Sequence, residues 1–247
     1  MTDNLLISAA GVTKKFGSLT AVDNVYMDIY SGGIYGVAGL NGAGKSTLLM
    51  ILAGVTRPDS GSVRYAAGKI RVGYVPQDIA LFPDLSVYDN MKFWALAGFS
   101  AKDSPTTAAP LKKRILRVSE TAGLSDRLRQ PVRSLSGGMK QRVNIAAALI
   151  ADPDILIMDE PTAGLDVKNR RDILNFINGL AKRGQGSLAV VCTSHQSGEL
   201  EMISDRLLLL DRGQTIFDGP PGEVFSGKYS SYNNIDDILY SLGNTEN

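Results

Sequence analysis

The sequence contains very little cysteine, histidine and net charge, and each shortage excludes a class of protein. Its 247 residues include one cysteine and one histidine, and 26 basic residues are balanced by 25 acidic ones. A single thiol cannot form an internal disulfide, which fits a reducing compartment. A net charge of +1 argues against nucleic acid or an anionic membrane surface as the main partner.

Long apolar runs are also missing. None approaches the roughly 20 residues that a membrane-spanning helix needs, and the first residues lack the basic start of a secretory signal. We therefore expect a cytoplasmic chain whose role at a membrane, if it has one, comes through a partner. The length is sufficient to bury a full α/β core.

The most informative segment present is a glycine-rich loop between two apolar runs. Residues 39–47 read GLNGAGKST, after the apolar residues 34–38 and before the apolar residues 48–53. The first run predicts a buried strand and the second a helix, which is the order of a phosphate-binding P-loop. Glycines let backbone N–H groups approach phosphate oxygens, Lys45 supplies charge to the outer phosphates, and Ser46 offers a hydroxyl to Mg²⁺. A glycine-rich turn between core elements is the plainer alternative, which the offset of Lys45 and Ser46 disfavours.

A pair of carboxylates follows another apolar run. Asp159 and Glu160 come directly after residues 155–158, which read ILIM. Ligands of open α/β sheets gather at the carboxyl ends of the strands. Asp159 suits the Mg²⁺ shell, and Glu160 suits polarisation of the water that attacks the γ-phosphate. An acidic surface turn is the weaker alternative once a P-loop is present.

A second glycine pair opens a later helix. Residues 135–142 read LSGGMKQR, and alone such a segment is more often a helix-capping loop. It would nevertheless present another phosphate-facing helix N-terminus. One chain with one P-loop has no evident use for two such ends on one nucleotide. The economical arrangement is a pair of chains, each offering this segment to the nucleotide held by the other.

Together these segments resemble the ATP-binding-cassette (ABC) ATPases, and the resemblance covers nearly the whole chain. In that family's pattern residues 39–47 are the Walker A loop, 135–142 the signature and 155–160 the Walker B strand with its glutamate. Residues 163–166 match the D-loop, which crosses the dimer interface. Gln77 matches the Q-loop glutamine that touches Mg²⁺ and reports to the partner subunit.

The histidine and an aromatic residue complete the pattern. His195 is the only histidine and follows an apolar run. A lone histidine is usually structural, but here it matches the switch histidine that holds the γ-phosphate. Phe16 matches the aromatic that stacks on adenine, where the family often has tyrosine, and packing in a loop is its alternative role.

The resemblance implies a full set of site residues. The expected catalytic residues are Glu160, His195 and Lys45. The expected nucleotide contacts are Phe16, Val22, Asn41, Gly42, Ala43, Gly44, Lys45, Ser46, Thr47, Gln77, Ser136, Gly137, Gly138 and Asp166. The expected Mg²⁺ ligands are Ser46, Gln77 and Asp159.

The expected fold class is α/β, with a P-loop NTPase core sheet, an N-terminal antiparallel β region and a helical subdomain insert. Residues 1–247 would form one nucleotide-binding domain, with the helical insert at about 84–150 and a short helical tail at about 228–247. Strands are predicted around 25–29, 63–65, 70–75, 155–158, 188–193 and 207–210, and helices at about 86–97, 111–122 and 138–151. Residues 100–110 are predicted to be a loop or a break. An amphipathic helix at 235–242 is expected to pack on the body, with docking onto a partner as the alternative.

The resemblance implies an ATPase that dimerises around ATP and Mg²⁺ and powers a separate transmembrane permease. The partner cassette would be identical or different, and the chain would lie peripherally on the cytoplasmic face of the membrane. Residues 82–90 are similar to the segment found in exporters of drugs, peptides and polysaccharides, which favours export. The alternative is a soluble cassette that remodels a cytosolic assembly such as an iron–sulfur scaffold. A P-loop kinase or GTPase is disfavoured because neither uses the signature segment.

Overall fold

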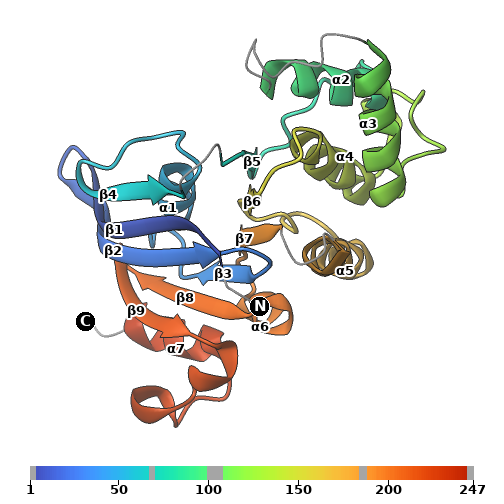
Figure 1. The fold of residues 1–247 in the computed structure, drawn as a ribbon. Helices are drawn as coiled ribbons and strands as arrows, with labels where there is room; N and C mark the ends of the chain where they lie inside the picture. Colours follow the sequence, from blue (N-terminus) through green and yellow to red (C-terminus); the bar gives the residue numbers. More distant parts are fainter. Residues whose placement is uncertain (1–3, 67–69, 99–107, 184–187, 244–247) are drawn as a thin grey trace.

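Two β-sheets pack face to face, and the helices lie on the other side of the larger sheet, beside it or between the sheets (Figure 1). The computed structural model describes residues 4–66, 70–98, 108–183 and 188–243. The smaller sheet has the order β2-β1-β4 and contains β1 (Leu5–Phe16), β2 (Leu19–Tyr30) and β4 (Ser60–Tyr65). The larger sheet has the order β5-β6-β7-β3-β8-β9 and contains β3 (Ile34–Ala38), β5 (Val72–Val75), β6 (Ile155–Met158), β7 (Ala189–Thr193), β8 (Arg206–Asp211) and β9 (Gln214–Gly219). The expected α/β class with an antiparallel N-terminal sheet is confirmed.

The described part of the chain contains seven α-helices. They are α1 (Lys45–Leu52), α2 (Val87–Gly98), α3 (Ala108–Thr121), α4 (Gly137–Leu149), α5 (Val167–Arg183), α6 (Ser197–Ile203) and α7 (Ile235–Gly243). Short 3₁₀ turns are η1 (Val132–Ser134), η2 (Pro221–Glu223) and η3 (Gly227–Tyr229). Among the described residues, no helix has both the length and the apolar character needed to cross a bilayer.

The central strands are buried on both faces. In β6, Leu156 and Met158 pack toward the helices, whereas Ile155 and Ile157 pack toward the smaller sheet. β7 and β8 divide their side chains between the same two cores. Parallel strands that are covered on both sides need continuous apolar sequence, which explains the unbroken runs.

The smaller sheet is antiparallel and has only one buried face. Val25, Met27 and Ile29 of β2 are buried and alternate with exposed residues, as the sequence predicted. α1 contributes Leu48 and Leu49 to the same core, so this helix lies between the two sheets. The start of α1 is thereby held against both β-layers.

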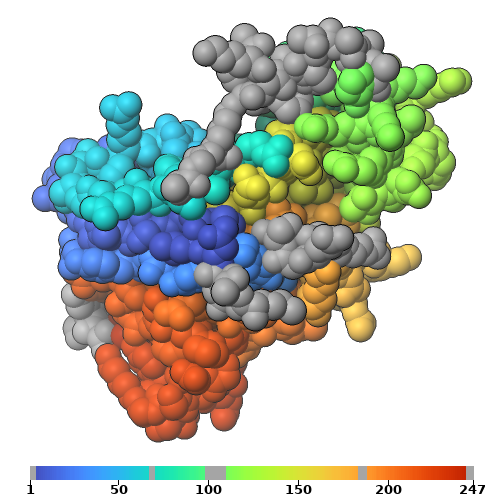
Figure 2. Space-filling view, in the orientation of Figure 1, coloured from blue at the N-terminus to red at the C-terminus, as the bar shows by residue number. Residues whose placement is uncertain are grey.

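Helices α2, α3 and α4 all lie between β5 and β6 in the sequence and form a separate group beside the sheets (Figure 1). Figure 2 shows α3 on the lobe farthest from the N-terminal strands. The predicted capping of α2 is present, because Ser86 Oγ accepts a hydrogen bond from the Asp89 N–H at 3.1 Å and donates to the Asp89 carboxylate at 2.5 Å. Leu111, Ile115 and Val118 form the expected buried face of α3.

The boundary of α3 was predicted wrongly. Most of the predicted loop at 100–110 lies outside the described residues, but α3 begins at Ala108 and therefore includes Pro110. A proline is tolerated in the first turn of a helix because the N–H groups there have no intrahelical acceptor.

Two further elements frame the core. The C-terminal helix α7 packs on the body as expected, since Ile235, Ile238 and Leu239 are buried in the helix-side core. The long helix α5 was not predicted, although Ile173 and Ile177 anchor it in the same core.

The single thiol gives a test of this packing. Cys192 is 1% exposed, and burial raises its pKa to about 12. The thiolate is the reactive form, so we expect a thiol reagent to leave the native protein unlabelled at neutral pH. The same reagent in denaturant should label one thiol per chain, measured by absorbance or mass. Stoichiometric labelling of the native chain would contradict the buried position of β7.

Candidate functional site

The strand order brings four loops to one edge of the larger sheet. β5, β6, β7 and β3 are adjacent and parallel, so their carboxyl ends lie together. Gln77 follows β5, Asp159 and Glu160 follow β6, His195 follows β7, and the glycine-rich loop follows β3. Residues more than 150 positions apart in the sequence thus meet at a single site.

A cavity of about 460 Å³ opens at this edge. It is lined by Phe16, Leu19, Ala21, Asn41, Gly42, Ala43, Gly44, Lys45, Ser46, Thr47, Gln77, Glu160 and His195. Eleven of these were expected nucleotide contacts or catalytic residues, and Leu19 and Ala21 are additions.

The glycine loop adopts a backbone that other residues rarely take. Gly42 and Gly44 have φ angles of 81° and 100°. A Cβ on Gly44 would lie 2.0 Å from the carbonyl oxygen of Ala21. Gly44 is also the N-cap of α1 and offers no side-chain hydrogen bond to the first turn, so the N–H groups there are open to an anion.

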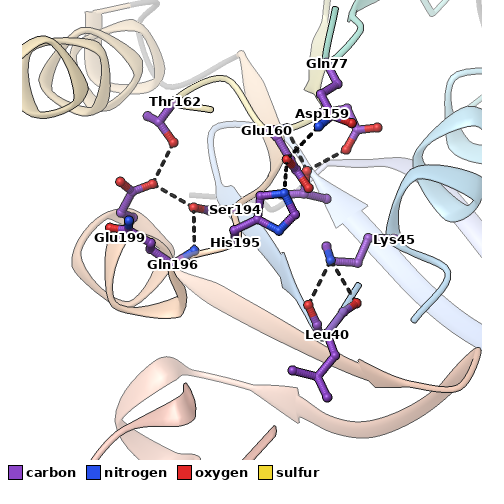
Figure 3. Close-up of polar contacts among 12 residues, drawn as sticks. Leu40, Lys45, Gln77, Asp159, Glu160, Thr162, Ser194, His195, Gln196 and Glu199 are labelled. Carbon is purple, nitrogen blue, oxygen red and sulfur yellow. Dashed lines mark hydrogen bonds and ion pairs between the residues drawn. The ribbon is translucent and has the colours of Figure 1, made fainter. Parts of the chain in front are cut away.

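Lys45 lies buried at the start of α1 with its ammonium group turned into the loop (Figure 3). Its Nζ donates to the carbonyl oxygens of Gly39 at 2.8 Å and Leu40 at 3.1 Å. Burial lowers the pKa of Lys45, and the charges of Glu160 and Asp159 oppose that shift. Because its hydrogen bonds go to neutral carbonyls, the positive charge remains available to an anion in the cavity.

The two carboxylates at the end of β6 are both buried. Asp159 is 4% exposed and is not among the residues that line the cavity, although its charge acts on Lys45. Its Oδ1 accepts a hydrogen bond of 2.7 Å from Thr193 Oγ1. The N–H of Glu160 donates to the same Thr193 oxygen at 2.8 Å. Thr193 was not among the expected site residues. The only sequence feature that distinguishes it is its position as a polar residue at the end of an apolar strand.

The carboxylate of Glu160 is held from two sides (Figure 3). Gln77 Nε2 donates to its Oε2 at 3.0 Å, and His195 Nε2 contacts the same oxygen. Burial raises the pKa of Glu160, while the nearby charges of His195 and Lys45 lower it in part. A carboxylate with a raised pKa, aimed into a polar cavity, is suited to general base chemistry.

Of two further expected nucleotide contacts, Phe16 lies at the cavity and Val22 does not. Phe16 is 52% exposed at the rim of the cavity, where an aromatic face is accessible for stacking. Val22 is fully buried in the core between the sheets and is not brought to the cavity. Leu19 and Ala21, which both precede Val22 in β2, take that place in the lining.

The second glycine segment lies away from the cavity. Ser136, Gly137, Gly138 and Asp166 are all absent from its lining. Ser136 caps α4 by accepting from the Met139 N–H at 3.4 Å. The start of α4 lies against the start of α5 instead, because a Cβ on Gly138 would meet Asn169 Oδ1 at 2.6 Å and Asn169 is hydrogen-bonded to Asp166.

Asp166 fixes the start of α5 in that neighbourhood. Its carboxylate accepts hydrogen bonds from the N–H and the side-chain amide of Asn169 at 2.9 and 2.6 Å. The bond from the Asn169 N–H lowers the pKa of Asp166, so this cap is anionic.

A buried ionic cluster links the segment after Glu160 to the loop that carries His195 (Figure 3). Glu199 Oε2 accepts hydrogen bonds from Thr162 and Ser194, both at 2.7 Å. Its Oε1 lies 3.2 Å from Arg170 Nε. Arg170 also donates to Gln196 at 2.5 Å, so the cluster joins both segments to α5 and α6. No sequence motif pointed to these residues.

The donors at the cavity fit a triphosphate with a divalent cation. Uncapped N–H groups and Lys45 supply positive charge, and Ser46, Gln77 and Asp159 supply oxygens at the same sheet edge. Among the described residues no group of three or more His, Cys, Asp or Glu side chains could bind a metal alone. A cation here would therefore complete its shell with phosphate oxygens and water, as Mg²⁺ commonly does.

Comparison with known proteins agrees with this geometry. The sequence model of the ABC transporter family matches residues 22–163. The chain is 36% identical over 230 residues to the linearmycin resistance ATP-binding protein LnrL of Bacillus subtilis, covering 90% of this chain and 71% of that protein. It is 35% identical to the Nod factor export ATP-binding protein I of Ralstonia nicotianae, covering 90% and 69%.

A solved structure is similar in fold as well. The ATP-binding cassette MJ0796, in a dimeric post-hydrolysis state bound to ADP and phosphate, superposes with a TM-score of 0.75 at 26% identity. The match covers 87% of this chain and 99% of that one.

Proposed function

The chain belongs to the ABC transporter family of ATP-hydrolysing cassettes, and we propose that it powers a separate membrane permease for export. The observation that carries the proposal is the single cavity that Lys45, Gln77, Glu160 and His195 share at the edge of the sheet. The chain would then lie on the cytoplasmic face of the membrane, held there by the permease.

The proposed chemistry divides the hydrolysis among these residues. The glycine loop and Lys45 bind the phosphates, and the N-terminus of α1 stabilises their charge. Glu160 accepts the proton of the attacking water, and His195 contacts the γ-phosphate while holding the Glu160 carboxylate in place. Phe16 stacks on adenine. Ser46, Gln77 and Asp159 would hold Mg²⁺, which would supply positive charge to neutralise the phosphates.

We further propose that two chains share each nucleotide. Ser136, Gly137, Gly138 and Asp166 are outside the cavity of their own chain, so a partner cassette is the source that would supply them. The dimeric state of the similar cassette MJ0796 supports this arrangement. The partner could be an identical or a different cassette, since either would supply the same segments. The closed pair would bind ATP better than ADP.

The permease would dock beside Gln77. A cavity of about 320 Å³ between β5, α2 and α4 is lined mostly by small apolar residues. Trp94 Nε1 and Asn144 Nδ2 are buried in it without hydrogen-bond partners. Phe82, which is 42% exposed and packs edge-on against Phe93, extends the apolar surface at this side. We propose that a cytoplasmic helix of the permease fills this groove and offers acceptors to both donors.

In this proposal residues 1–247 act as one nucleotide-binding domain. The helices within about 84–150 form the subdomain that contacts the permease, and the segment at about 228–247 is a tail that packs on the body. Export is supported by the relatives named for linearmycin resistance and for Nod factor export.

Glu160→Gln tests the proposed base. The variant keeps the size of the side chain but cannot accept a proton, so turnover should fall by about 10²- to 10⁴-fold while ATP still binds. ATPase assays and size-exclusion chromatography with ATP should show a slow enzyme in a persistent dimer. The exposed Glu223→Gln is the matched control and should behave as wild type. Unchanged phosphate release in Glu160→Gln would refute the role.

The pH dependence of kcat is a second test. Glu160 works as a base only when it is deprotonated, and burial raises its pKa above the ordinary 4.5 of a glutamate. The rate should therefore fall as pH decreases, with a midpoint above 4.5. The residual rate of Glu160→Gln should lack this acid limb. An identical limb in that variant would assign it to another group.

Phe82→Ala tests the docking surface. Loss of an aromatic anchor at an interface costs about 2 kcal/mol or more, roughly thirty-fold in affinity. Permease stimulation of ATPase activity should therefore decline while basal activity persists. Leu116→Ala, an exposed apolar residue of α3 outside the groove, is the control. Tyr88 is a poorer probe because it also packs against the core. Full stimulation of Phe82→Ala in reconstituted vesicles would exclude this surface.

A further inference from the structure

Thr193 is a hydroxyl at the end of a strand that is otherwise apolar. It is 0% exposed, and the four residues before it in β7 are buried apolar side chains. A buried hydroxyl without partners is unfavourable by about 1–3 kcal/mol, so its hydrogen bonds account for its presence there. Both bonds go to the acidic pair that directly follows the neighbouring strand β6.

One oxygen atom contacts both acidic residues at once. Thr193 Oγ1 accepts from the Glu160 N–H at 2.8 Å and donates to Asp159 Oδ1 at 2.7 Å. The register of β6 against β7 pairs Met158 with Cys192, which sets Thr193 alongside Asp159. Because one hydroxyl accepts from the Glu160 N–H and donates to the Asp159 carboxylate, it holds these two groups in a fixed relation.

The backbone of Glu160 needs such a restraint. Its φ angle of 49° lies in the left-handed region, which costs a residue with a Cβ about 1–2 kcal/mol. The side chain is held at its far end by Gln77 and His195. Thr193 is the contact that holds the near end, where a change of φ would swing the carboxylate.

We propose that Thr193 is a positioning residue for ATP hydrolysis, which fixes the left-handed turn at Glu160 and the orientation of Asp159. The inference rests on the proposed role of Glu160 as the base. Thr193 acts through its two neighbours, so its loss should lower the rate of the chemical step without weakening the binding of ATP.

Thr193→Val and Thr193→Ser separate the hydroxyl from the shape of the side chain. The valine variant is nearly isosteric but removes both hydrogen bonds, and it should lower kcat by about 10- to 100-fold with KM for ATP unchanged. The serine variant keeps the hydroxyl and should retain a kcat close to wild type. Thr193→Ala removes the hydroxyl together with a methyl group and should show the same loss of kcat as valine.

Two controls distinguish positioning from stability. Ser119→Ala removes another fully buried hydroxyl, which donates to the Leu116 carbonyl in α3, and should change the melting temperature but not kcat. In the Glu160→Gln background, Thr193→Val should cause little additional loss, because the two residues act in one step.

Each result has a distinct meaning. A wild-type kcat in Thr193→Val, or a serine variant as slow as valine, would overturn the inference while a slow Glu160→Gln leaves the proposed function intact. A loss of kcat that merely follows the folded fraction would also overturn it. Undiminished turnover in Glu160→Gln would instead refute the proposed function itself.

Discussion

Burial of the central parallel strands on both faces is the constraint on which the rest of this molecule depends. Alternate residues of β6, β7 and β8 enter two separate cores, so charge is confined to strand ends, as with Arg206 and Asp211 of β8. The polar residues of the site therefore lie in the loops that follow the strands. The strand order then decides which of those loops are neighbours, and the close packing of the cores gives the loops fixed anchor points.

The elements that could be predicted from the sequence were those with strong local patterns. The apolar runs of β3, β6 and β7 and the glycine loop before α1 are short, continuous and chemically specific. Most of the residues expected around a nucleotide do line one cavity. These residues could be predicted because the carboxyl ends of adjacent parallel strands lie at one edge of the sheet. Residues that follow different strands therefore come together at one site.

The remainder depended on long-range information. The strand β1 is interrupted by Gly11, whose φ of 60° accompanies register shifts against both neighbours and breaks the alternation of side chains. Helix α5 carries its apolar residues on one narrow stripe among many charges. The contact of Thr193 with the acidic pair requires that β6 and β7 be adjacent, and no local pattern gives the order of strands. Val22 shows the reverse error, since a family position pointed to a residue that lies in the core.

The shared carboxylate of Glu199 has a mechanical consequence. The buried Glu199 carboxylate is the shared partner of Thr162, Ser194 and Arg170. Moving one segment alone would leave a buried charge without its partner, which costs roughly 3–5 kcal/mol. The segment after Glu160, which carries Thr162, and the loop that carries Ser194 and His195 are therefore coupled through Glu199. Displacement of one segment would therefore move the other, and loss of the Arg170 side chain would leave the Glu199 carboxylate buried without its charged partner.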